Sequence, residues 1–155
     1  MRLYRIVPRE YADSFSGLGA SYQDGARWNE PKLPVLYFAL SPSVAMLEMA
    51  NYFPSPRLVP KFYVLATYII EDKYVTLELE HLPKDWSEYP YPRSTQKLGT
   101  DWLKSQKSLG LLVPSCAVPS GLENILVINP KHPDIKKLKL VSTTPEIYNN
   151  RAFNA

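Results

Sequence analysis

The sequence predicts a single α+β domain, and three observations support that fold class. The chain has 155 residues and a mass of 17.7 kDa, which is the size of one hydrophobic core. Its 15 prolines interrupt it too often for long helices, because proline removes a backbone donor and clashes with the preceding turn. Strand-like runs alternate with a few helical patterns. We therefore expect residues 1–155 to form one compact domain, in which short helices flank a sheet.

The predicted strands are runs of aliphatic, β-branched or aromatic residues between turn-forming residues. They cover residues 3–7, 35–39, 62–70, 74–79, 111–113 and 125–128.

Two helices are predicted. Ser41 is a suitable N-cap and Pro42 suits the first helical position, so a helix is expected over residues 42–52. Apolar residues repeat at helical spacing over residues 95–106, which predicts the second. Residues 21–25 are expected to form a turn, and the proline-rich segment 82–93 an irregular loop.

The composition argues against several kinds of site. Lys and Arg number 18 and Asp and Glu 15, and the net charge of +3 is too weak to predict nucleic-acid binding. The single Cys116, with only His81 and His132, cannot supply a structural zinc site. We therefore expect no metal, and Cys116 as a small buried residue without thiol chemistry. The first residues lack the apolar core of a secretory signal, so we expect a cytoplasmic protein that binds neither a membrane nor nucleic acid directly.

Glu48 is the only charged residue between Leu33 and Pro56. Apolar residues surround it on every side of the predicted helix, so we expect this helix to lie inside the protein. A buried carboxylate is costly unless a cation or a hydrogen-bonding ligand meets it. Two interpretations stay open: a site carboxylate on a rigid helix, or a structural glutamate that pairs with a buried arginine or reaches solvent.

A glycine-rich segment leads to Arg27 and Trp28. Gly17 and Gly19 lack the third glycine of a dinucleotide-binding fingerprint, and the Gly-Lys-Ser/Thr triplet of a P-loop is absent. The fork of an arginine suits bidentate phosphate binding, and a neighbouring indole offers a face for stacking on a base or a nicotinamide ring. A salt-bridged arginine beside a core tryptophan is the alternative.

Ser115 lies in the uncharged segment 108–122. A nucleophilic serine would need a base and a strand–turn–helix elbow of the Gly-x-Ser-x-Gly type, and neither is visible. We therefore expect a hydrogen-bonding role for Ser115, and no Ser-His-Asp hydrolase.

Taken together and in order, these pieces resemble the RES domain, a family named for an Arg, a Glu and a Ser and found as the toxin of RES–Xre toxin–antitoxin pairs. Arg27, Glu48 and Ser115 fall on the three namesake positions, and Tyr37 falls on the active-site tyrosine of the family. The matching motifs are Tyr4-Arg5-Ile6, Ser16-Gly17-Leu18-Gly19-Ala20, Gly25-Ala26-Arg27-Trp28-Asn29, Val35-Leu36-Tyr37-Phe38-Ala39, Ala45-Met46-Leu47-Glu48, Asp101-Trp102-Leu103, Val113-Pro114-Ser115 and the segment 124–134.

The resemblance implies a fold with a mostly antiparallel, ADP-ribosyltransferase-like split β-sheet flanked by short helices. It implies a toxin that consumes NAD+ as its substrate, without a cofactor, by cleaving the nicotinamide–ribose N-glycosidic bond through hydrolysis or phosphorolysis. Such a cleavage passes through an oxocarbenium-like transition state, which a carboxylate stabilises, and Glu48 is the expected carboxylate. The residues expected to contact the substrate are Arg27 on the pyrophosphate, Tyr37 and Trp28 at the nicotinamide ribose, and Ser115 and Asn124 as hydrogen-bonding groups.

Two other functions stay open, a mono-ADP-ribosyltransferase that modifies a protein at the same site and a catalytically inactive binding module. The resemblance also implies a partner, a cognate Xre-like helix-turn-helix antitoxin, and a homodimer within a larger toxin–antitoxin complex is one expected assembly.

Overall fold

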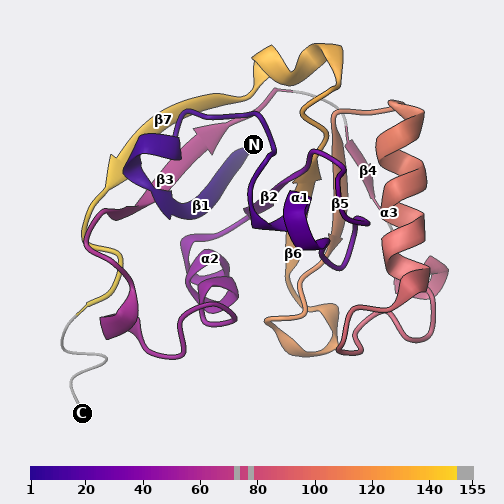
Figure 1. Cartoon of the computed structure of the whole chain (residues 1–155), viewed down its shortest axis with the longest axis horizontal. Coiled ribbons are helices and arrows are strands. Elements are labelled where there is room, and N and C mark those ends of the chain that lie inside the picture. The colour runs from indigo at the N-terminus through magenta and orange to yellow at the C-terminus, as the bar shows by residue number, and fades with distance from the viewer. Residues whose placement is uncertain (72–73, 77–78, 150–155) are drawn as a thin grey trace.

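The computed structural model describes residues 1–71, 74–76 and 79–149 of the chain (Figure 1). Within these residues, one sheet has the strand order β4-β5-β6-β2-β1-β3-β7. Its strands are β1 (Arg2–Pro8), β2 (Leu36–Ala39), β3 (Tyr63–Ile69), β4 (Tyr74–Thr76), β5 (Gly110–Pro114), β6 (Asn124–Ile128) and β7 (Lys139–Thr144). Neighbouring strands are antiparallel except β4 and β5, which are parallel. The predicted α+β fold with a mostly antiparallel sheet is confirmed.

The helices are short, as the prolines predict. They are α1 (Ala20–Asp24), α2 (Pro42–Met49) and α3 (Arg93–Ser105), with 3₁₀ turns η1 (Arg9–Tyr11), η2 (Pro56–Leu58), η3 (Leu79–His81), η4 (Pro119–Gly121) and η5 (Pro133–Lys137). Helix α1 corrects the expectation of a plain turn over residues 21–25. Its five residues are too few to show a helical repeat, and Gly25, at φ +78°, ends it in a conformation that favours glycine.

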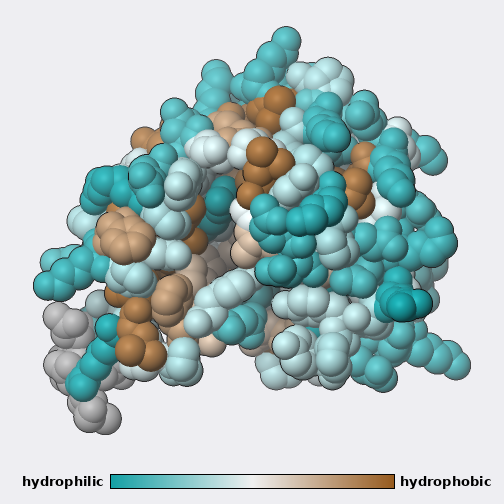
Figure 2. Space-filling view, viewed as in Figure 1, coloured by the Kyte–Doolittle hydropathy of each residue, from teal (hydrophilic) through white to brown (hydrophobic). Residues whose placement is uncertain are grey.

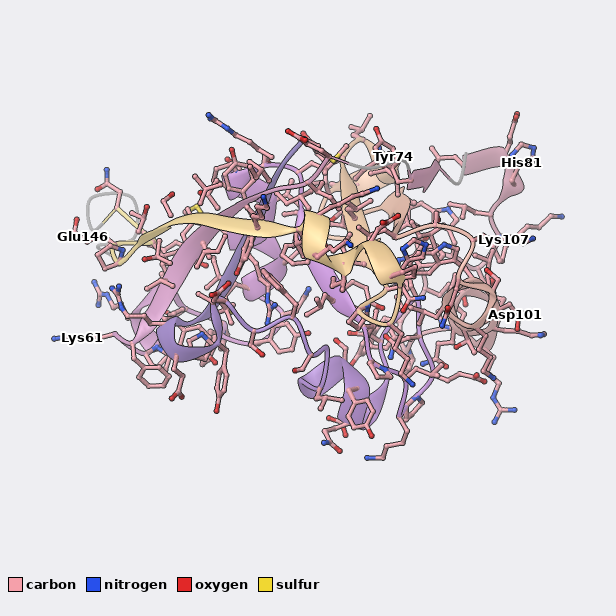
Figure 3. All side chains as sticks on the ribbon, turned by 90° about the horizontal axis from the view of Figure 1, so that it is seen from above. Lys61, Tyr74, His81, Asp101, Lys107 and Glu146 are labelled. Carbon is pink, nitrogen blue, oxygen red and sulfur yellow. The ribbon has the colours of Figure 1, made fainter. Side chains whose placement is uncertain are left out.

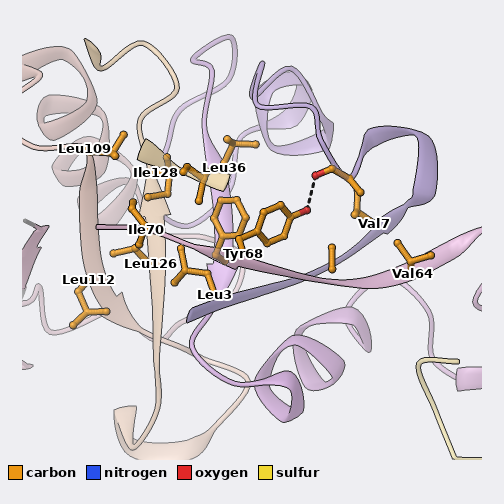
Figure 4. Close-up of a cluster of buried hydrophobic side chains, with 14 residues drawn as sticks. Leu3, Val7, Leu36, Val64, Tyr68, Ile70, Leu109, Leu112, Leu126 and Ile128 are labelled. Carbon is orange, nitrogen blue, oxygen red and sulfur yellow. Dashed lines mark hydrogen bonds between the residues drawn. The ribbon is translucent and has the colours of Figure 1, made fainter. Parts of the chain in front are cut away.

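Both faces of the sheet are covered by apolar side chains. Along β6, Ile125 and Val127 belong to the cluster under α2 and α3, whereas Leu126 and Ile128 belong to the cluster on the opposite face. This alternation is the period of two that a strand imposes. On the opposite face, Tyr68 packs edge-on against Phe38 and its hydroxyl donates to the carbonyl of Ala12 over 2.8 Å (Figure 4).

The sheet is nearly divided between β1 and β2. These two strands pair at one position, Tyr4 with Ala39, whereas β1 and β3 pair from Arg2 to Pro8 and β2 pairs with β6 along its whole length. The strands on either side of this junction therefore diverge. This confirms the split sheet that the family resemblance implies.

Strand β7 was not predicted from the sequence. It is an edge strand in which four of six residues are Lys, Ser or Thr and most side chains are exposed, so it carries little of the apolar signal that marks a strand. Its pairing with β3 comes through the backbone instead.

The expectation that α2 lies inside the protein is wrong. Val44, Ala45 and Met49 are buried, but Pro42 and Ser43 are exposed and the side chain of Leu47 is 48% exposed. The helix is therefore half-buried at the surface, with apolar residues on its outer side.

Charged side chains gather at the periphery. Lys61 and Glu146 lie at one end of the molecule, and His81, Asp101 and Lys107 lie at the other (Figure 3). The face over α3 is hydrophilic, while apolar groups are more frequent on the side of α2 and η2 (Figure 2). No helix in the described part of the chain is long and apolar enough to cross a membrane.

Candidate active site

A cleft of about 790 Å³ opens where β1 and β2 diverge. Both strands line it, together with α2 and the segment from Ser14 to Ser21. Its volume lies in the ~300–1,000 Å³ range of small-molecule sites. The cleft brings together Arg27, Trp28, Tyr37 and Glu48, which lie on a turn, a strand and a helix between residues 27 and 48.

Helix α2 carries Glu48 to the wall of this cleft. Its first turn is fixed because the Ser41 hydroxyl accepts the Val44 N–H over 3.2 Å, as the N-cap prediction requires. The carboxylate accepts a hydrogen bond at each oxygen: Ser115 Oγ donates to Oε1 over 2.6 Å and Asn51 Nδ2 donates to Oε2 over 3.3 Å. Glu48 is half-buried, so its carboxylate is held in one orientation while it still faces the cleft.

Ser115 lies behind Glu48 and away from the open cleft. The residue is 0% exposed and follows β5 directly. Its hydroxyl gives its proton to Glu48 and accepts the Ala117 N–H over 3.1 Å. In this arrangement the serine positions the carboxylate, where the sequence predicted a contact with substrate.

Arg27 is anchored to the proline-rich loop 82–93. Its Nη1 donates to the carbonyls of Trp86 and Glu88, each over 2.7 Å, and its guanidinium carbon lies 5.3 Å from the centre of the Tyr91 ring. The other nitrogens of the guanidinium carry further N–H donors, and both Arg27 and Tyr91 line the cleft. The loop that was predicted to be irregular therefore fixes the arginine at the site.

Tyr37 lines the cleft from β2. Its hydroxyl accepts the Trp28 N–H over 3.2 Å and donates to Asn29 Oδ1 over 2.7 Å. Burial raises the pKa of Tyr37 well above its ordinary value, so the hydroxyl stays protonated at neutral pH. Trp28 is 1% exposed, so its indole is part of the core and offers no open stacking face.

Helix α3 holds the turn that carries Arg27. Gln96 Nε2 donates to the Ala26 carbonyl over 3.2 Å, and the Glu30 N–H donates to Thr100 Oγ1 over 3.0 Å. Between them, Gly99 touches the backbone of Trp28 so closely that a Cβ would overlap its carbonyl. The turn is thus docked on a rigid helix.

Arg5 also lines the cleft, and the sequence did not single it out as a site residue. Its Nη1 is buried without a hydrogen-bond partner, and its guanidinium carbon lies 5.8 Å from the centre of the Phe38 ring. Burial lowers the pKa of Arg5, but an arginine stays charged at neutral pH. A signal was present, because Arg5 interrupts the alternation of apolar residues between Leu3 and Val7 in a predicted strand.

The structure places Cys116 and Asn124 elsewhere than the sequence predicted. Cys116 is exposed and lines the cleft, so the expectation that it is buried is wrong; it lies in the turn that follows buried Ser115. Partial burial raises the pKa of its thiol, which therefore stays protonated at neutral pH.

Asn124 begins β6 opposite Pro114 and is not among the described residues that line the cleft. Within the described part of the chain, no group of three or more His, Cys, Asp and Glu side chains could hold a metal ion.

Comparisons with known proteins place the chain in a family. The family model described as the RES domain matches residues 2–149. The chain is 40% identical over 133 residues to a protein named Toxin Res from Yersinia enterocolitica, covering 85% of this chain and 86% of that one. It is 34% identical over 143 residues to a protein named Prs ADP-ribosylating toxin from Sphingobium sp., covering 90% of this chain and 87% of the relative.

A solved structure is similar over nearly the whole chain. A chain of the MbcT–MbcA toxin–antitoxin complex from M. tuberculosis superposes with a TM-score of 0.73 at 24% identity, covering 98% of this chain and 87% of that one. At this identity the likeness establishes the shared fold.

Proposed function

Because this chain belongs to the RES domain family, we propose that it is a toxin that degrades NAD+ by cleaving the bond between nicotinamide and ribose. The observation that carries the proposal is one cleft that joins a carboxylate held at both oxygens, Glu48, to two guanidiniums, those of Arg5 and Arg27. A dinucleotide presents the matching charges, a pyrophosphate for the arginines and a ribose that becomes cationic for the carboxylate.

The reaction follows from the charges. The C1′–N bond breaks, and its electron pair moves to the ring nitrogen of nicotinamide, which leaves as a neutral molecule. Positive charge develops on the ribose, where Glu48 stabilises it. A water or a phosphate oxygen then bonds to C1′, and with water one proton is released. No general acid is needed, because the leaving ring is already cationic, and this suits a cleft whose described lining contains no histidine.

The test is nicotinamide release from NAD+ by the purified chain, with and without inorganic phosphate. Glu48→Gln keeps the shape and one acceptor oxygen but removes the charge, so we expect the rate to fall about 100-fold or more. Glu123→Gln is the matched control, because it removes an exposed carboxylate outside the cleft and should leave the rate unchanged. Equal rates in the two variants would overturn the role of Glu48.

The product identifies the acceptor. Free ADP-ribose indicates attack by water, whereas a phosphorylated ADP-ribose that forms only when phosphate is added indicates phosphorolysis.

A protein acceptor is the second candidate, favoured by the relative whose name describes an ADP-ribosylating toxin. The same cleavage would then deliver ADP-ribose to a side chain of another protein. Incubation of the chain with tagged NAD+ and a cell lysate would give a labelled protein band in that case. Nicotinamide release without such a band favours the NAD+-degrading reaction.

A protein antitoxin is the proposed partner, of the Xre-like helix-turn-helix type. Several relatives are named as toxins, and the similar fold was solved in a toxin–antitoxin complex. A small helix-turn-helix protein encoded by the neighbouring gene should co-purify with this chain and suppress nicotinamide release. We propose that the pair acts in the cytoplasm, and the mass of the purified complex would show whether the toxin is present as a homodimer.

A further inference from the structure

Asn29 is a polar residue that the fold buries completely. It is 0% exposed, and each end of its side-chain amide is paired: Nδ2 donates to the carbonyls of Ser21 and Glu30 over 2.7 and 3.0 Å, and Oδ1 accepts from Tyr37 over 2.7 Å. The two carbonyls can only accept hydrogen bonds, so they fix which end of the amide carries the oxygen. Asn29 must therefore present Oδ1 to the tyrosine.

This orientation determines what the Tyr37 hydroxyl can do. Its single proton is given to Asn29, while the Trp28 N–H occupies a lone pair over 3.2 Å. The hydroxyl has no proton left for a substrate or a leaving group. What Tyr37 offers to the cleft is its ring, held at the hydroxyl end by two directional contacts.

We propose that Asn29 is a positioning residue for the cleavage reaction, acting through Tyr37 by fixing its ring against the substrate. The inference rests on the proposed NAD+ cleavage. Burial raises the pKa of the tyrosine, so the ring carries no negative charge that would compete with Glu48 for the cationic ribose.

The backbone of Asn29 has a separate role from its side chain. Its carbonyl accepts the Ala26 N–H over 3.0 Å and its own N–H donates to the Ala26 carbonyl over 3.4 Å, which closes the turn beside Arg27. Any residue except proline can make these two contacts. A change of side chain therefore tests the link to Tyr37 without removing the turn.

The test is a double-mutant cycle on nicotinamide release with Asn29→Ala, Tyr37→Phe and the double variant. Tyr37→Phe keeps the ring and leaves both contacts of Asn29 to carbonyls intact, so it folds even if the alanine variant is less stable. Each single change should lower kcat about five- to tenfold with a smaller change in KM, and Tyr37→Phe should be the slower variant because it also loses the contact with the Trp28 N–H. The double variant should be no slower than the slower single variant, since both act through one contact.

Losses in kcat that multiply in the double variant would overturn the proposal, and so would a fall in Tm for Asn29→Ala with kcat unchanged. If the unaltered chain released no nicotinamide, the proposed function would fail instead. The position of the ring is then decided by a crystal structure of Asn29→Ala, where a displaced Tyr37 ring supports the inference and an unmoved ring contradicts it.

Discussion

Glu48 and Arg5 represent two different ways of holding a charge in one cleft. Glu48 has its partners within the protein, since Ser115 and Asn51 occupy both carboxylate oxygens. Arg5 has a buried Nη1 with no partner in the described structure, which costs stability. The first arrangement fixes the carboxylate in one orientation, as the proposed cleavage requires, and the second leaves an unpaired donor in the wall of the cleft.

Ser115→Ala should lower kcat for nicotinamide release about tenfold, with KM changed less, because Glu48 loses the 2.6 Å hydrogen bond that orients it. Steady-state kinetics checks this. Ser87→Ala, at an exposed position, is the control and should behave as the unaltered chain. A rise in KM with kcat unchanged would show that Ser115 contacts the substrate instead.

Arg5→Met should raise KM for NAD+ about tenfold while the free energy of unfolding stays the same or rises by up to about 2 kcal/mol. Methionine fills similar volume without burying an unpaired N–H, whereas the substrate loses a charged partner. Kinetics and urea unfolding measure the two effects. Arg2→Met, at an exposed position, should change neither, and a stability loss in Arg5→Met would refute the argument.

At the scale of elements, the sequence predicted the strands and helices whose side chains carry a periodic apolar signal. Strands β1, β2, β3, β5 and β6 and helix α3 were found within one or two residues of their bounds, and β4 begins where predicted, although part of its predicted range lies outside the described residues. Helix α1 and strand β7 were missed, because one is a single turn and the other is an exposed edge.

The site could be predicted only in part, for a related reason. A lone carboxylate in an apolar segment identified Glu48, and the family pattern identified Arg27, Tyr37 and Ser115. The contact between Ser115 and Glu48, separated by 67 positions, depends on how distant segments meet in space. The side-chain hydrogen bonds of Asn29 join residues one to eight positions away, but they depend on the conformation of an irregular turn. Local periodicity contains no information on such pairs.

Gly99→Ala tests whether α3 positions the turn at the site. Alanine favours a helix over glycine by about 1 kcal/mol, but its Cβ would overlap the Trp28 carbonyl, and overpacking against main chain costs about 1–3 kcal/mol. We therefore expect a lower Tm and a weaker hold on Arg27, seen as a higher KM for NAD+. Gly19→Ala is the control for stability, because a Cβ there meets nothing within 4 Å. A Tm for Gly99→Ala equal to or above that of the unaltered chain would rule out the close contact.

At the scale of the whole molecule, the divided sheet explains why the site exists. The strands on each side of the junction have their own partners, so β1 and β2 diverge without leaving either half unsupported. Apolar clusters on both faces span the junction and hold the halves together. The cleft is therefore a feature of the fold that persists when no ligand is bound.

The same buried core predicts how the domain unfolds in alkali. Burial raises the pKa of Tyr68 to about 12, from an ordinary value near 10. Below about pH 10 the hydroxyl is protonated in both the folded and the unfolded chain, so its contribution to stability is complete. Between about pH 10 and pH 12 only the unfolded chain releases the proton, and the free energy of unfolding should fall by about 1.4 kcal/mol per pH unit for this group. Urea unfolding across that range measures the slope.

Tyr68→Phe should be less stable near neutral pH by about 1 kcal/mol, since the Ala12 carbonyl loses its donor, but its slope above about pH 10 should be shallower. Tyr89→Phe, at a position 81% exposed, should keep the slope of the unaltered chain, and equal slopes in the two variants would show that Tyr68 titrates normally.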